Sequence, residues 1–233
     1  MSWVIVPAAG SGVRFGAELP KQYQQLVGRP LIAQTLSRLL AHPAIEGAIV
    51  ALVAEDAHWA TLALHFDKPV LTCIGGADRA DSVLAALHAL PAEVVDDALV
   101  LVHDAARPCV RSDDLDRLIH AAQEDSVGAL LASPVRDTLK RADARARALA
   151  TEPREQFWRA QTPQAFRRGA LIHALEQARA DGVAITDEAM AMERLGLQPL
   201  LVEGSEDNIK VTVAADLALA ERILAMQCAE QST

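Results

Sequence analysis

The chain has 233 residues, 51% of them hydrophobic, and a formal net charge of −9; these values are typical of a globular protein with one large or two small domains. The acidic balance argues against nucleic-acid and anionic-membrane partners. The longest apolar stretches, such as Ala48 to Ala54, are too short to span a bilayer. The start of the chain lacks the basic and long apolar segments of a signal peptide, and its three cysteines lie far apart without metal-ligand spacing. We therefore expect a cytoplasmic protein with reduced thiols and no zinc site.

Short apolar runs alternate with helical patterns along the first half of the chain. We expect buried strands at Trp3–Val6, Ala48–Ala54, Val70–Ile74 and Leu99–His103. We expect helices between them at about 31–41, 56–65, 80–90 and 112–124. This alternation predicts an α/β fold with a mostly parallel sheet, helices on both faces, and ligands bound outside the carboxyl ends of the strands.

The pattern changes after the apolar run from Gly128 to Val135. The stretch from Thr138 to Phe166 is typical of strands joined by a polar turn, and we interpret residues 134–160 as a protruding β-arm on a single domain that spans 1–233. From Arg136 to Arg159 there are seven basic and four acidic side chains, so this window is +3 and the remainder −12. A basic segment could receive a phosphorylated small molecule, but on charge alone a solvated arm is the better explanation. The α/β pattern then resumes, with helices near 168–181, 187–195 and 214–227 and a strand near 199–203.

A run of small residues follows the first predicted strand, from Pro7 to Gly16, with Pro20-Lys21-Gln22-Tyr23 shortly after it. Small residues let backbone N–H groups approach phosphate oxygens, and Arg14 and Lys21 can supply the opposing charge. The segment is not a P-loop, because no Gly-Lys-Ser/Thr closes it, and its glycines miss the dinucleotide-binding spacing by one residue. It predicts an anion-binding loop. A structural tight turn would explain the glycines but not the two cations.

Two further strands end in polar or glycine-rich segments. Gly75-Gly76 precedes Ser82, and this pair could admit a ligand, or could form a turn before a helix that Asp81 or Ser82 caps. The fourth strand is followed by His103-Asp104-Ala105-Ala106-Arg107. The carboxylate and guanidinium, three residues apart, indicate a binding site. His103 is interpreted as a packed histidine, since no Gly-x-Ser-x-Gly elbow accompanies it.

The later segments are individually weak signals. They are Asp137-Thr138, Arg154, Gln161-Thr162-Pro163-Gln164, Thr186-Asp187-Glu188-Ala189 and Asp207-Asn208-Ile209-Lys210-Val211-Thr212. Thr186 alone would be explained as a helix N-cap, and Lys210 as the solvent-facing lysine of a strand. Their order along the chain carries the information.

Taken together, the segments from Pro7 to Thr212 resemble the 2-C-methyl-D-erythritol 4-phosphate cytidylyltransferase family. That family has the glycine-rich loop with its arginine, Pro-Lys-Gln, Gly-Gly-x-x-Arg-x-x-Ser, His-Asp-Ala-Ala-Arg-Pro, an arm with Asp-Thr and a later arginine, Thr-Pro-Gln, Thr-Asp-Glu-Ala and Asp-Asn-Ile-Lys-Val-Thr. All occur here in this order. Phe15 stands where the family usually has methionine. The resemblance implies a Rossmann-like nucleotidyltransferase sheet, Mg²⁺, and a homodimer clasped through the arms.

The resemblance also implies a reaction and a set of site residues. The cytidylyl group of CTP would pass to 2-C-methyl-D-erythritol 4-phosphate (methylerythritol phosphate), in isoprenoid precursor biosynthesis. Four residues are expected to be catalytic: Arg14 and Lys21 on the triphosphate, Arg154 and Lys210 on the attacking phosphate. We place cytosine and ribose against small or hydroxyl residues, namely Ala8, Ala9, Gly10, Gly76 and Ser82. We assign methylerythritol phosphate to Asp104, Arg107, Thr138 and Thr186, with Thr138 reaching in from the partner's arm. Mg²⁺ would bridge the triphosphate oxygens, and no protein ligand for it is named.

Three alternatives stay open. Ribitol 5-phosphate cytidylyltransferases have a similar glycine-rich loop and Thr-Pro-Gln, but Ala105-Ala106 and Asn208-Ile209-Lys210 favour methylerythritol phosphate. A nucleotide-binding regulatory module would have no use for the cations at 14, 21 and 210. A nicotinamide-dependent oxidoreductase would need the dinucleotide-binding glycine spacing and an acidic residue about twenty positions further on.

Overall fold

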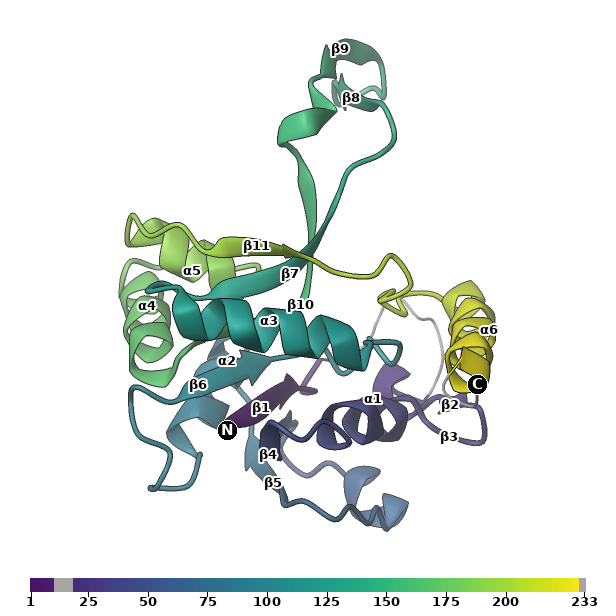
Figure 1. Cartoon of the computed structure of the whole chain (residues 1–233), viewed down its shortest axis with the longest axis vertical. Helices are drawn as coiled ribbons and strands as arrows, with labels where there is room; N and C mark the ends of the chain where they lie inside the picture. The colour runs from purple at the N-terminus through teal and green to yellow at the C-terminus, as the bar shows by residue number, and fades with distance from the viewer. Residues whose placement is uncertain (11–18, 231–233) are drawn as a thin grey trace.

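A seven-stranded sheet forms the centre of the protein in a computed structural model that describes residues 1–10 and 19–230 (Figure 1). Its strands are β1 (Ser2–Pro7), β4 (Ile45–Leu52), β5 (Val70–Ile74), β6 (Leu99–Val102), β7 (Ala129–Pro134), β10 (Trp158–Arg167) and β11 (Leu200–Glu203). They lie in the order β11-β7-β10-β6-β1-β4-β5. β10 runs antiparallel to β6 and β7, and the other neighbours are parallel. The predicted α/β class with a mostly parallel sheet is confirmed.

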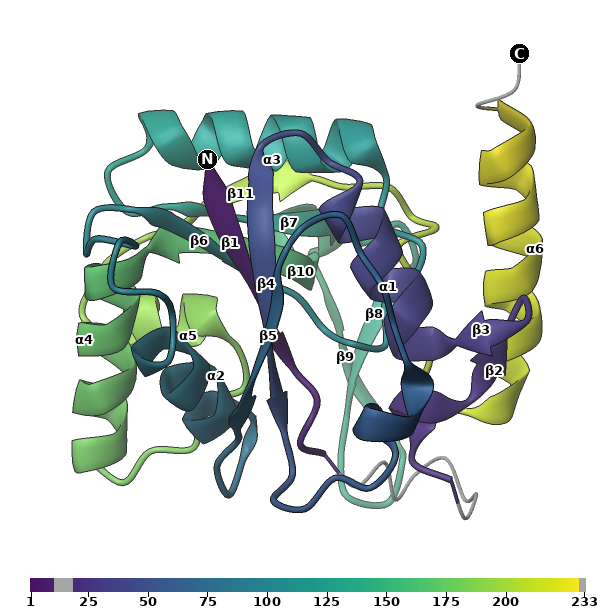
Figure 2. The same cartoon turned by 90° about the horizontal axis from the view of Figure 1, so that it is seen from below.

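Helices cover both faces of this sheet, because successive strand side chains point to opposite sides. These helices are α1 (Leu31–Leu40), α2 (Arg79–His88), α3 (Ser112–Glu124), α4 (Arg168–Ala180) and α5 (Glu188–Arg194), whereas α6 (Ala214–Glu230) lies beside the sheet. Val4 and Val6 of β1 pack with α1 and α3, whereas Trp3 and Ile5 pack with α2, α4 and α5. Figure 2 shows α3 and α4 on opposite sides of the strands.

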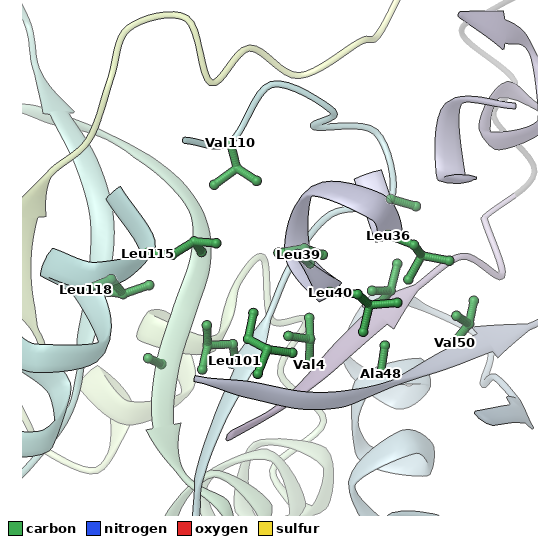
Figure 3. Close-up of a cluster of buried hydrophobic side chains, with 14 of the residues drawn as sticks. Val4, Leu36, Leu39, Leu40, Ala48, Val50, Leu101, Val110, Leu115 and Leu118 are labelled. Carbon is green, nitrogen blue, oxygen red and sulfur yellow. The ribbon is translucent and has the colours of Figure 1, made fainter. Parts of the chain in front are cut away.

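The first of these two cores illustrates how a helix pattern produces burial. Leu36 and Leu39 lie on the face of α1 that meets the sheet, beside Val4 and Leu101 (Figure 3). Both leucines are fully buried. Truncating such a side chain to alanine costs about 2–5 kcal/mol of stability. The packing of α1 therefore stabilises the central strands, whose carboxyl ends we call the strand edge.

Two smaller units stand beside the sheet. The strands β2 (Gln25–Leu26) and β3 (Arg29–Pro30) form a short hairpin, and α6 packs on its buried Leu26. The strands β8 (Leu139–Ala142) and β9 (Ala148–Glu152) pair antiparallel with each other and project from the body (Figure 1). This hairpin lies within the segment 134–160 that we call the arm. Single turns of 3-10 helix occur at η2 (Lys21–Tyr23), η3 (Trp59–Leu62) and η4 (Arg154–Gln156).

Two expectations about elements are wrong. The helix expected at 56–65 is only η3, because the Asp56 carboxylate accepts hydrogen bonds from the N–H groups of His58 and Trp59 and so forms a local turn. Ala63 then adopts a left-handed φ of 44°. The strand Val70–Ile74 is not buried but lies at the sheet edge, where the Ile74 side chain is exposed. In the described part of the chain, no helix is long and apolar enough to cross a membrane.

Candidate active site

A small pocket lies at the carboxyl ends of β1 and β5. Its volume is about 110 Å³, and it is lined by Pro7, Ala9, Gly10, Gly76, Ala77, Asp78, Arg79 and Ser82. Four of the five residues predicted to hold the nucleoside are therefore together. The fifth, Ala8, is buried and does not line the pocket, and its carbonyl accepts a hydrogen bond of 2.9 Å from the amide of Gln22. Arg14, predicted to be catalytic, lies outside the described residues.

The wall of this pocket explains the paired glycines. A Cβ on Gly76 would lie 2.2 Å from Cβ of Asp81, and one on Gly75 would lie 2.8 Å from Oγ of Ser82. The glycines are thus required by the close approach of α2. The cap of α2 is Asp78, whose carboxylate accepts from the Asp81 N–H, so the alternative of Asp81 or Ser82 as cap is wrong. Ser82 instead accepts from the Gly76 N–H (3.1 Å) and fixes the wall.

Asp104, two residues after the end of β6, is the centre of an ion-pair cluster whose two carboxylates are buried. Its Oδ1 accepts a hydrogen bond of 3.1 Å from Arg79 Nε, and its Oδ2 lies 2.8 Å from Lys210 Nζ and 3.6 Å from Arg107 Nε. Arg79 also donates to both oxygens of Glu188, at 2.6 and 3.2 Å. We call these five residues the Asp104 cluster. Three cations face two carboxylates, so the cluster has one positive charge in excess.

The electrostatics of the Asp104 cluster follow from burial and these neighbours. Burial would raise the pKa of Asp104, but the charges of Arg79 and Lys210 outweigh burial and hold that pKa well below its usual range. Burial would lower the pKa of Arg79, yet Glu188 and Asp104 raise it. Burial raises the pKa of Glu188, and the charge of Arg79 opposes this shift. The Lys210 side chain remains 40% exposed. The cluster therefore presents a fixed positive group to an anion at the strand edge.

His103 lies under the cluster in a complete hydrogen-bond network. The Asp104 N–H donates to Thr162 Oγ1 (3.0 Å), which lies 3.2 Å from His103 Nδ1, and His103 Nε2 lies 2.9 Å from the Arg107 carbonyl. The Arg107 carbonyl can only accept a hydrogen bond, so Nε2 carries the proton. The threonine hydroxyl then donates to Nδ1. Burial lowers the pKa of His103 to about 4. The prediction of a packed histidine is confirmed.

Lys21 begins η2, and the next two side chains fix this turn. The amide of Gln22 bonds to the Ala8 carbonyl, and the hydroxyl of Tyr23 donates to Asp56 at 2.7 Å. Both side chains are buried, whereas Lys21 is half-buried. The start of the glycine-rich segment and the lysine that follows it are thereby tied together.

The remaining predicted residues are not all at this edge. Thr186 is exposed, and its place as helix cap is wrong because Asp187 caps α5, with its carboxylate accepting from the Met190 N–H. Thr186 is nonetheless two residues from Glu188 of the Asp104 cluster. Thr138 and Arg154 lie on the arm, where Arg154 donates to the carbonyl of Arg136. Within one chain the structure shows no contact between these two arm residues and the Asp104 cluster.

Sequence reasoning missed four residues of this edge as site residues. Arg79 and Glu188 belong to the ion-pair cluster, Thr162 belongs to the hydrogen-bond network of His103, and Gln164 supports the start of α5. Gln164 donates to Asp187 (2.9 Å) and accepts from the Ala189 N–H (2.8 Å), so it holds the start of α5 on both sides of Glu188. The available signal was the position of Arg79, three residues after the paired glycines.

The residues at this edge do not form a cage for a metal ion. Among residues 1–10 and 19–230, no group of three or more histidine, cysteine or acidic side chains is arranged to hold one. Both oxygens of Asp104 already face cations. Mg²⁺ is typically bound through one or two carboxylates, substrate phosphates and water, so the protein groups alone do not fit a resident metal.

Comparisons with known proteins identify a family for this chain. The family model for 2-C-methyl-D-erythritol 4-phosphate cytidylyltransferase matches residues 2–226. A protein of that name from Xanthomonas oryzae pv. oryzae (strain PXO99A) is 60% identical over 223 residues, covering 96% of this chain and 82% of that protein. One from Stenotrophomonas maltophilia (strain K279a) is 60% identical over 222 residues, covering 95% and 96%.

Solved structures are similar along almost the whole chain. A crystal structure of a 4-diphosphocytidyl-2C-methyl-D-erythritol synthase has a TM-score of 0.83 and 34% identity, and covers 96% of this chain and 98% of that one. The Francisella tularensis 2-C-methyl-D-erythritol 4-phosphate cytidylyltransferase has a TM-score of 0.82 and 34% identity, with 95% and 99% covered. The sequence, the fold and the residues gathered at the strand edge place this chain in the 2-C-methyl-D-erythritol 4-phosphate cytidylyltransferase family.

Proposed function

We propose that this chain transfers the cytidylyl group of CTP to 2-C-methyl-D-erythritol 4-phosphate, giving 4-diphosphocytidyl-2-C-methyl-D-erythritol and pyrophosphate, in isoprenoid precursor biosynthesis. Membership of the family supports this proposal. The observation that carries it is the Asp104 cluster, with its excess positive charge, beside a pocket of small residues at the same strand edge. Such a site suits two phosphorylated substrates, one of which brings a base and ribose.

The chemistry asks for charge neutralisation and positioning. An oxygen of the phosphomonoester attacks the α-phosphorus of CTP, and the bond from that phosphorus to the bridging oxygen breaks as pyrophosphate leaves. No general base is needed, since a phosphomonoester with a second pKa of about 6 is largely dianionic at neutral pH. Two anions must meet, so fixed cations offset their repulsion and the charge that develops on the transferred group.

Each predicted residue has a role in this scheme. Lys21, and Arg14 outside the described residues, hold the triphosphate. Two cations receive the sugar phosphate: Lys210, whose Nζ is 2.8 Å from Asp104, and Arg107, which donates to the Asn208 carbonyl and faces Asp104 at 3.6 Å. Thr186 is assigned to the same substrate. Mg²⁺ would accompany the triphosphate as its counterion and would need no cage of protein ligands. The cytoplasmic location stays a prediction from the sequence.

We also propose a homodimer in which Arg154 and Thr138 of one arm complete the partner's site. Three apolar side chains of this region, Leu149, Phe157 and Trp158, are exposed in the single chain. An isolated two-stranded hairpin is marginal in water. The basic arm and the acidic remainder have opposite charge, which favours contact between copies. Native mass spectrometry should therefore give twice the chain mass of 24.9 kDa.

The test of the reaction is pyrophosphate release from CTP in the presence of methylerythritol phosphate, run beside ribitol 5-phosphate. We expect kcat/KM for methylerythritol phosphate to exceed that for ribitol 5-phosphate by at least about a hundredfold, because misplaced hydroxyls leave polar groups of the site unpaired. Comparable values would favour the ribitol alternative. No release with either acceptor would refute the proposal.

A further inference from the structure

Glu188 is a buried carboxylate that the reaction scheme does not use. It is the first residue of α5, its side chain is 1% exposed, and both its oxygens accept from the guanidinium of Arg79. Gln164 holds the residues on either side of it. The carboxylate is therefore fixed by the backbone of α5, and Arg79 has to adapt to it.

The planar guanidinium transmits this constraint. Because Nη1 and Nη2 of Arg79 both face Glu188, the direction of the Nε–H is set, and it points to Oδ1 of Asp104. Oδ2 is the oxygen that remains for Lys210 and Arg107. The chain of contacts from Glu188 through Arg79 to Asp104 thus fixes the carboxylate that orients Lys210 and faces Arg107.

Arg79 also connects two parts of the site. It lines the pocket of small residues that we assign to the nucleoside, and it contacts the carboxylate beside Lys210. A shift of Arg79 would change the pocket wall and the position of Lys210 together. Replacing Glu188 by a neutral group would also leave a second uncompensated positive charge in the Asp104 cluster. Arg79 could then bind a substrate phosphate away from its productive position.

We propose that Glu188 is a positioning residue for cytidylyl transfer, acting through Arg79 and Asp104 to fix Lys210 against the attacking phosphate. The inference rests on the proposed function of this edge. A purely structural ion pair between α5 and α2 would affect stability alone. A positioning residue also changes turnover in the folded protein.

The test compares Glu188→Gln with a matched control. Asp114 is an equally buried carboxylate, which contacts Arg117 and Ser205 and belongs to neither the Asp104 cluster nor the pocket. We expect Glu188→Gln to lower kcat at least about tenfold and to raise the KM for methylerythritol phosphate. Asp114→Asn should lower the thermal midpoint similarly but keep kcat within about twofold of the parent. Turnover of Glu188→Gln equal to that of Asp114→Asn would overturn the proposal.

A second variant decides the matter if Glu188→Gln does not fold. Glu188→Asp keeps the charge but withdraws the carboxylate by one methylene, so we expect a folded protein whose kcat falls at least about threefold. Unchanged kcat in Glu188→Asp would refute the positioning role. Failure of the inference can be told from failure of the proposed function, because the parent must release pyrophosphate in the same assay. An inactive parent would refute both.

Discussion

The predicted site residues occupy two regions with very different surroundings. At the strand edge, the Asp104 side chain is 9% exposed and faces three cations supplied by α2, the segment after β6 and the segment before α6. On the arm, Arg154 is 49% exposed and Arg141 is 67% exposed, and the groups that they contact also belong to the arm. One region is buried in the body of the protein, and the other is exposed to water.

The charges at the strand edge are preorganised by the fold, whereas the charges on the arm are solvated in the single chain. Charges at the strand edge are fixed by packing and act through protein of low polarity, so each has a large effect on a phosphate. Charges on the arm are screened by water and counterions. They gain comparable strength only when another surface covers them. The body should therefore control the size of the catalytic effect, and assembly should control whether the arm contributes.

Removing a cation from the body of the protein should have the largest effect on turnover. We expect Lys21→Ala to lower kcat at least about a hundredfold, since removing one preorganised charge-stabilising group costs about 3–4 kcal/mol of transition-state stabilisation. The buried anchors Gln22 and Tyr23 remain, so the fold should be intact by circular dichroism. Near-normal kcat in the folded variant would contradict the assignment of this edge.

A mixing experiment tests whether Arg154 acts in the site of the partner subunit. Arg154→Ala and Lys21→Ala should each be inactive alone. If the arms cross, random pairing gives heterodimers with one intact site, so about a quarter of all sites in an equal mixture should work. If Arg154 serves its own subunit, every heterodimer site keeps one defect. No recovery in a sample that native mass spectrometry shows to contain heterodimers would refute the crossed arms.

Acid tests the buried region through His103. The pKa of His103 is lowered by burial to about 4 in the folded protein, against 6.5 for the unaffected side chain. The unfolded chain therefore binds more protons between pH 6.5 and about 4, and the free energy of unfolding falls as pH falls through that window. The loss should be on the order of 3 kcal/mol. Urea unfolding at pH 4.5 and pH 7 measures this change in the free energy of unfolding.

The control is His103→Gln, which should be less stable at pH 7 and whose free energy of unfolding should depend less on pH. An identical pH dependence in this variant would rule out His103 as its source.

Much of this body could be predicted from the sequence, because its signals are local. Apolar runs gave the parallel strands, and small or charged residues after them gave the pocket and Asp104. The ion pair between Arg79 and Glu188 could not be predicted in this way, since the two residues are 109 positions apart and neither has a local pattern that names its partner. The burial of a strand also depends on its place in the sheet. Val70–Ile74 has the composition of a buried strand and lies at the edge.

The expected helix at 56–65 failed for a different reason. Its periodicity predicts a helix, but Asp56 offers its carboxylate to nearby N–H groups and to the Tyr23 hydroxyl. That tertiary contact favours a turn. The hydrogen bond from Tyr23 to Asp56 also fixes the turn that begins with Lys21. The segment that is not helical therefore helps to position a predicted site residue.

The smallest expected effect concerns an arm ion pair. Arg141 lies 2.5 Å from Glu152 across the β8–β9 hairpin, a geometry that looks strong. Exposed pairs of this kind contribute about 0–1 kcal/mol, because water screens them and two long side chains must be ordered. We therefore expect Arg141→Ala to change the free energy of unfolding by less than about 0.5 kcal/mol. Urea denaturation of dilute protein measures this. A loss of about 2 kcal/mol or more would mean that the pair is buried in solution, and hence that a second surface already covers this side of the arm.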